Sequence, residues 1–126
     1  MSDTDLHDEH LRLTHALMML FDRWQADHDT QIRLLGLDNV SPRSMRRHEM
    51  TAVPYPAECM TRVRKLLRLG RTIETMLPHN PDAAQGWMLQ ANRMFSGIAP
   101  LDLVIKRGEE GIDVLQNHLD GTSAWG

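Results

Sequence analysis

The chain has 126 residues, a formal net charge of −3 and one cysteine. This length accommodates one domain or two small lobes, and the lone cysteine excludes a disulfide framework and a cysteine-based zinc site. No apolar run reaches membrane-spanning length, and the acidic N-terminus lacks the apolar core of a secretory signal. We therefore expect a cytoplasmic protein without membrane contact, which fits the sparse use of cysteine.

The N-terminal third predicts two helices. Apolar residues recur at steps of three and four over 3–26, which is typical of one buried helix face. A short helix follows over 30–35, with Asp29 as its cap and Gly36 as its end. The predicted inward positions of the first helix are Leu6, Leu13, Leu17, Leu20, Phe21 and Trp24.

A basic helix is predicted next, over 42–50, because Ser41-Pro42 is a strong start signal. A helix, a short helix, a turn and a basic helix in this order have the form of a helix-turn-helix DNA-binding unit. The second helix of such a unit reaches bases and phosphates with its early residues. Here those residues are Arg43, Ser44, Arg46 and Arg47. The alternative is a small helical bundle with an arginine-rich surface helix.

Basic residues continue in the middle of the chain, with few acids between them. This pattern favours a phosphate-facing surface on a mildly acidic protein. For the run over 62–71, a solvated helix face is an equally good interpretation. The basic residues of the middle are Arg43, Arg46, Arg47, Arg62, Arg64, Lys65, Arg68 and Arg71.

The C-terminal half predicts four more helices, over about 57–77, 81–90, 100–107 and 110–119, and a short polar tail over 122–126. Prolines mark the starts or ends of the first three, and glycines separate the last two. No strand pattern stands out. The sequence therefore predicts an all-α protein, with a helix-turn-helix-like lobe at 1–53 and a second helical lobe at 54–126.

Catalytic and metal-binding motifs are not found. The sequence contains no nucleophile elbow, phosphate loop, HExxH or paired-carboxylate motif. His7 and His10 lack a third ligand in register, and Cys59 has no base beside it in the sequence. We expect neither an enzyme nor a bound cofactor or metal.

The last third of the chain carries a family resemblance. An ordered set of residues resembles the toxin-binding domain of the MbcA/ParS/Xre antitoxin family, namely Trp87, Asn92, Gly97, Pro100, Leu101, Gly108, Gly111, Val114 and Leu119. Gln90-Ala91 departs from that family's usual proline-containing approach to the asparagine. The simpler interpretation is a core tryptophan, a proline helix start and two turn glycines.

The resemblance implies the antitoxin of a type II toxin–antitoxin pair. Its partner would be a RES-domain toxin, which consumes NAD, and the antitoxin would occlude the toxin's active site with its C-terminal helices and tail. The family also suggests that the N-terminal lobe binds operator DNA, as a homodimer. The rival hypotheses are a helix-turn-helix transcriptional regulator whose C-terminal lobe only dimerises, and a small interaction domain that never touches DNA.

Candidate partner-binding residues lie on the last helix and in the tail. Trp125 is the proposed apolar anchor, because a tryptophan in a small polar tail has no evident core role. The alternative is an exposed tryptophan in a frayed terminus. The polar candidates off the apolar stripe and in the tail are Asp113, Gln116, Asp120, Thr122 and Ser123.

Overall fold

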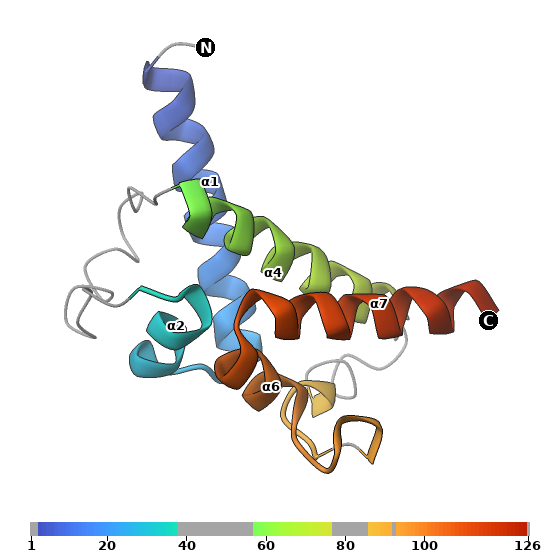
Figure 1. Ribbon diagram of the computed structural model, residues 1–126. Coiled ribbons are helices and arrows are strands. Elements are labelled where there is room, and N and C mark those ends of the chain that lie inside the picture. The colour runs from blue at the N-terminus through green and yellow to red at the C-terminus, as the bar shows by residue number, and fades with distance from the viewer. Residues whose placement is uncertain (1–2, 38–56, 77–85, 92, 126) are drawn as a thin grey trace. The chain divides into compact units, whose positions relative to one another are not determined.

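The computed structural model describes residues 3–37, 57–76, 86–91 and 93–125. These residues form five α-helices and one short 3-10 helix, with no strand among them, which confirms the all-α prediction (Figure 1). None of the helices in these ranges is long and apolar enough to cross a membrane. The predicted lobe boundary between 53 and 54 lies outside the described residues.

The chain divides into two compact units, Met1–Arg64 and Lys65–Gly126. The division falls inside one helix, α4 (Ala57–Met76). Each unit has its own buried side chains.

The first helix of the first unit, α1 (Asp3–Arg23), ends earlier than the periodicity predicts. Gln25 adopts the left-handed conformation, with φ 56°. The Ala26 N–H donates to Phe21 O and the Gln25 N–H to Asp22 O, at 2.9 and 3.1 Å. This paired arrangement is a Schellman ending, which stops the helix although apolar residues continue. The buried side chains of this region include Leu17, Leu20, Phe21 and Trp24, as predicted.

The second helix, α2 (His28–Leu35), is capped by Asp27, and the prediction of Asp29 as the cap was wrong. Asp27 Oδ1 accepts the Thr30 N–H at 2.8 Å, and this hydrogen bond lowers the pKa of the Asp27 carboxyl. Asp29 instead pairs with Arg33 one turn later, at 3.2 Å. Gly36 ends the helix with φ 67°, as predicted.

The start of α4 is joined to the end of α2 within the first unit. Cys59 Sγ donates to Leu35 O at 3.7 Å, and a Cβ on Gly36 would collide with the guanidinium of Arg62. Arg64 Nη2 lies 3.4 Å from Glu9 Oε1 of α1. Glycine at position 36 therefore serves both the left-handed turn and the close approach of Arg62.

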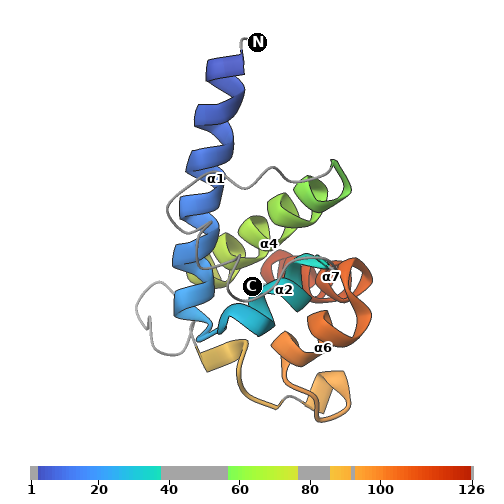
Figure 2. The ribbon, with the colours of Figure 1, turned by 90° about the vertical axis from the view of Figure 1, so that its left-hand side faces the viewer.

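The second unit contains the rest of α4, the 3-10 helix η1 (Arg93–Phe95), α6 (Pro100–Arg107) and α7 (Glu109–Trp125). Both ribbon views show α7 beside the second half of α4 (Figures 1 and 2). α6 begins at Pro100 and is closed by Gly108, with φ 63°, as predicted. The fully or nearly fully buried side chains here include Leu66, Leu69, Ile73, Met88, Val104, Ile112, Leu115 and Leu119.

Two glycines of α7 behave differently from expectation. Gly111 lies inside the first turn of α7 and is buried, so it does not break the chain between helices. Gly121 does not end α7, which continues to Trp125. Gly121 does not adopt a positive φ, and no proline follows it, so the backbone can stay helical at the modest cost of a glycine. The predicted 122–126 tail is therefore largely the last turn of α7.

Candidate interaction site

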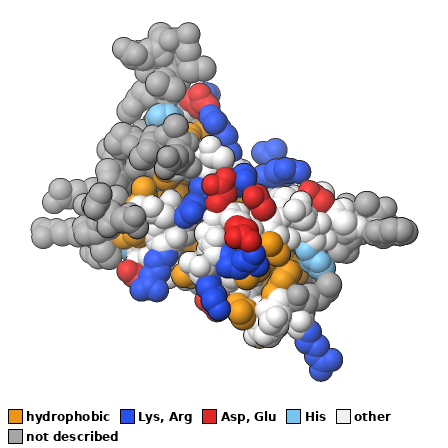
Figure 3. Space-filling view, viewed as in Figure 1, with side chains coloured by type: hydrophobic (Ala, Val, Ile, Leu, Met, Phe, Trp, Pro, Cys, Tyr) orange, Lys and Arg blue, Asp and Glu red, His pale blue; other side chains and the backbone are white. Residues whose placement is uncertain are grey.

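A row of polar contacts joins α4 to α7 in the second unit, and we call it the α4–α7 polar seam. It consists of Lys65, Arg68 and Thr72 on α4 and Glu109, Asp113, Gln116 and Asp120 on α7. On each helix the members recur at steps of three and four residues. Each set therefore lies along one helix face. Figure 3 shows acidic and basic side chains next to each other over these helices.

Lys65 bridges the first turns of α7. Its Nζ lies 2.8 Å from Glu109 Oε1 and 2.9 Å from Asp113 Oδ1. Hydrogen bonds to Glu109 and then to Asp113 raise the pKa of the Lys65 ammonium. The ammonium lies between two carboxylates that would otherwise repel each other.

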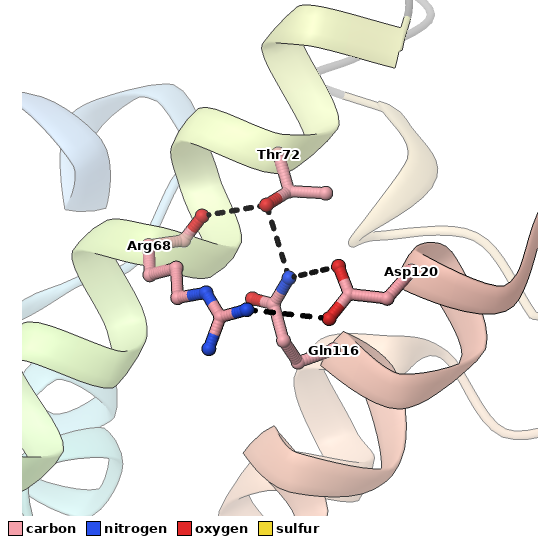
Figure 4. Close-up of polar contacts among 4 residues, drawn as sticks. All are labelled: Arg68, Thr72, Gln116 and Asp120. Atoms are coloured by element: carbon pink, nitrogen blue, oxygen red, sulfur yellow. Dashed lines mark hydrogen bonds and ion pairs between the residues drawn. The ribbon is translucent and has the colours of Figure 1, made fainter. Parts of the chain in front are cut away.

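Gln116 is the centre of the seam, as Figure 4 shows. Its Nε2 donates to Thr72 Oγ1 at 3.0 Å and to Asp120 Oδ1 at 2.9 Å. Thr72 Oγ1 in turn donates to Arg68 O at 3.0 Å, and Arg68 Nη2 lies 3.3 Å from Asp120 Oδ2. The four side chains thus form one connected set between the two helices.

The burial of Gln116 corrects its predicted placement. The side chain was expected off the apolar stripe of the last helix, but only 7 % of the residue is exposed. It lies beside Leu115 and Leu119, and its Oε1 accepts no hydrogen bond from the described residues. Gln116 is therefore part of the packing between α4 and α7, whereas Asp113 and Asp120 are exposed.

An apolar pocket of about 140 Å³ lies in the same unit, lined by Ile73, Met76, Trp87 and Leu119. Next to Trp87 in the chain, Met88 O accepts the N–H of Leu101 at the start of α6, at 2.9 Å. Trp87 was predicted to point into the core, but it is half-buried, at the wall of this pocket.

Phe95 connects the pocket wall to α7. Its ring meets Trp87 edge-on, with centroids 6.2 Å apart, and meets His118 edge-on at 5.4 Å. Edge-to-face pairs of this kind add stabilisation beyond the area that they bury. The ring set fixes the segment around Trp87 against α7.

The remaining predicted site residues are placed only in part. Thr122, Ser123 and Trp125 belong to the last turn of α7, but their side chains lie outside the described part of the structure. The predicted DNA-contacting residues Arg43, Ser44, Arg46 and Arg47 lie outside it altogether. In the ranges that are described, no group of three or more His, Cys, Asp or Glu is placed to hold a metal ion.

The α4 side of the seam was not predicted from the sequence. Lys65, Arg68 and Thr72 lie more than 40 residues from their partners on α7, as the separations of 48, 52 and 44 show. The only available signal was a basic run on one predicted helix and acids on another. Comparison of the chain with known protein families, with curated proteins and with solved structures gave no match.

Proposed function

We propose that this chain is the antitoxin of a type II toxin–antitoxin pair, acting in the cytoplasm. In this proposal it neutralises a RES-domain, NAD-consuming toxin by occluding the toxin's active site with the second unit. The N-terminal region binds operator DNA as a homodimer, through Arg43, Ser44, Arg46 and Arg47.

One observation carries the toxin-binding part of the proposal. Residues that resemble the toxin-binding domain of the MbcA/ParS/Xre family occupy positions in the second unit that demand those residue types. Pro100 starts α6 where no N–H is needed, and Gly108 ends it with φ 63°. Gly111 lies where any side chain would collide with the backbone of α6. These roles support the resemblance, because they explain why this order of residues builds this pair of helices.

The contacts of the polar seam separate the predicted partner-binding residues of α7 into exposed and buried ones. Asp113 and Asp120 are exposed, while Gln116 is buried against α4. In the proposal Asp113, Asp120 and the last turn of α7 with Thr122, Ser123 and Trp125 contact the toxin. Gln116 contributes by holding α7 in place.

Co-expression with the neighbouring open reading frame tests the proposal. A tagged copy of the chain should co-elute with that gene product in size-exclusion chromatography, and the complex should not consume NAD. Removal of 122–126 should restore toxicity in a growth assay. An Asp102→Asn variant on the exposed side of α6 is the control, and it should neutralise normally. Unchanged neutralisation after the truncation would contradict a role for the last turn of α7.

The operator-binding part has its own test. Replacement of Arg46 and Arg47 by alanine should reduce retention of promoter DNA in a gel shift and leave toxin binding unchanged. Replacement of the exposed Arg93 by alanine serves as the control for a lost positive charge elsewhere. The rival, a regulator whose second unit only dimerises, predicts a DNA-binding dimer that captures no toxin.

A further inference from the structure

The basic residues of α4 differ in how closely the rest of the chain holds their side chains. Between Cys59 and Ile73 the sequence has five basic residues and no acid. Arg62 packs on Gly36 in the first unit, and Arg64 pairs there with Glu9. In the second unit Lys65 is held by two carboxylates.

Two arginines in the second half of α4 face solvent. The Arg68 side chain is 68 % exposed, and its ion pair with Asp120 is long, at 3.3 Å. Arg71 is exposed, and its guanidinium makes no ion pair or hydrogen bond with any residue that the structure describes. An exposed pair such as Arg68–Asp120 contributes little to stability, so a stronger anionic partner can displace it.

We propose that Arg68 and Arg71 form a phosphate-contacting edge of α4 that binds the backbone of duplex DNA. The two residues are three apart, so they are neighbours on one helix face, about 4.5 Å apart along its axis. A guanidinium binds a phosphate through two parallel hydrogen bonds and stays charged at any physiological pH. Two such groups side by side suit a polymer that presents a phosphate at every nucleotide.

This inference rests on the operator-binding part of the proposed function and extends it. Contacts to phosphates carry no sequence information, so this edge adds affinity and fixes orientation while other residues read the bases. Its loss should therefore weaken binding to all duplexes alike.

The test is a salt titration of the full-length chain on a mixed-sequence duplex. The Arg68→Gln/Arg71→Gln variant is compared with Lys106→Gln/Arg107→Gln, which removes the same charge from the exposed end of α6. The slope of log K against log salt is negative, and each lost phosphate contact makes it shallower by about 0.9. The slope of the α4 variant should thus be shallower by about 2. Raising the salt from about 50 to about 200 mM should then weaken its DNA affinity by a factor roughly tenfold smaller than in the wild type. The α6 variant should keep the wild-type slope.

If the double variant folds poorly, Arg71→Gln alone still tests the proposal, because the Arg71 guanidinium has no ion pair or hydrogen bond to lose among the described residues. Its slope should fall by about 1. The proposal is overturned by an unchanged slope, by an equal loss in the α6 variant, or by a wild-type chain that does not bind the duplex. Loss of toxin neutralisation with an unchanged DNA slope would also overturn it and would show that this edge faces a protein. A failure of the antitoxin assignment itself would appear in the growth assay and would leave this titration unaffected.

Discussion

Gly111 of α7 faces the carbonyl oxygen of Leu103 in α6 so closely that a Cβ at position 111 would lie 2.7 Å from that oxygen. The obstacle is backbone, which cannot rotate away as a long side chain can. Gly121, further along the same helix, has nothing within 4 Å of its Cβ position. The packing therefore requires glycine at position 111 but leaves room for a side chain at position 121 of the same helix.

Gly111→Ala should destabilise the protein by about 1–3 kcal/mol, because α6 must shift to admit the methyl group. Gly121→Ala should stabilise it by about 0.5–1 kcal/mol, because alanine favours the helix and meets no neighbour. Urea unfolding followed by circular dichroism measures both changes. If the two variants shifted the unfolding midpoint in the same direction, that result would show that α6 does not pack closely on α7 at Gly111.

Thr72→Val removes the hydroxyl that accepts the Gln116 amide and should cost about 0.5–1.5 kcal/mol. Thr75→Val is a matched control one turn later, since the Thr75 hydroxyl donates to Arg71 O within the same helix and the residue is exposed. That variant should lie within about 0.5 kcal/mol of the wild type. A Thr72→Val/Gln116→Leu double-mutant cycle isolates the pair. Additive changes in the free energy of unfolding would show that the seam does not couple these residues.

Much of the architecture follows from local signals in the sequence. Pro100 and Gly108 bound α6 as predicted, because a proline start and a glycine end with positive φ are decided within a few residues. The errors arose where another local choice competed. Asp27 and Asp29 are both good caps, and the Schellman ending at Gln25 frees Asp27 for the role.

The candidate site was less predictable, for a different reason. Asp113 and Asp120 were identified as polar residues of the last helix, but their partners Lys65 and Arg68 come from another part of the chain. Periodicity places a residue on a face of its own helix, but it does not show what that face meets. Gln116 was misplaced for this reason, because a glutamine in an apolar stripe is buried only if a partner such as Thr72 is present.

Lys65→Met should lower Tm more at low salt than at high salt, because it removes the cation between Glu109 and Asp113. Lys106→Met is the control, since Lys106 is exposed and has no ion pair with a described residue. The pKa of Lys65 is raised above its ordinary 10.5, so its contribution is complete below that pH and is lost as pH rises through the raised value. The Tm difference between wild type and Lys65→Met should therefore shrink at strongly alkaline pH. A difference that was equal for both lysines, or independent of salt, would contradict the bridge.

Cys59 should be unreactive in the folded protein. Only 6 % of the residue is exposed, its Sγ donates to Leu35 O, and burial raises the pKa of the thiol to about 11. Because the thiolate is the nucleophile, a neutral and buried thiol reacts slowly with disulfide reagents near pH 8. Labelling should proceed at the rate of unfolding and become fast in denaturant, which serves as the internal control.

The same raised pKa gives a pH dependence with a definite sign. The unfolded thiol loses its proton near its ordinary 9.0, whereas the folded one keeps it to about 11. The folded state then binds more protons between these values, so the free energy of unfolding should fall as pH rises through this window. Cys59→Ala removes this dependence, and comparison of the two pH profiles isolates it from the titration of Lys65. Rapid labelling of the native protein at pH 8, or identical alkaline profiles, would show that Cys59 is not buried against α2.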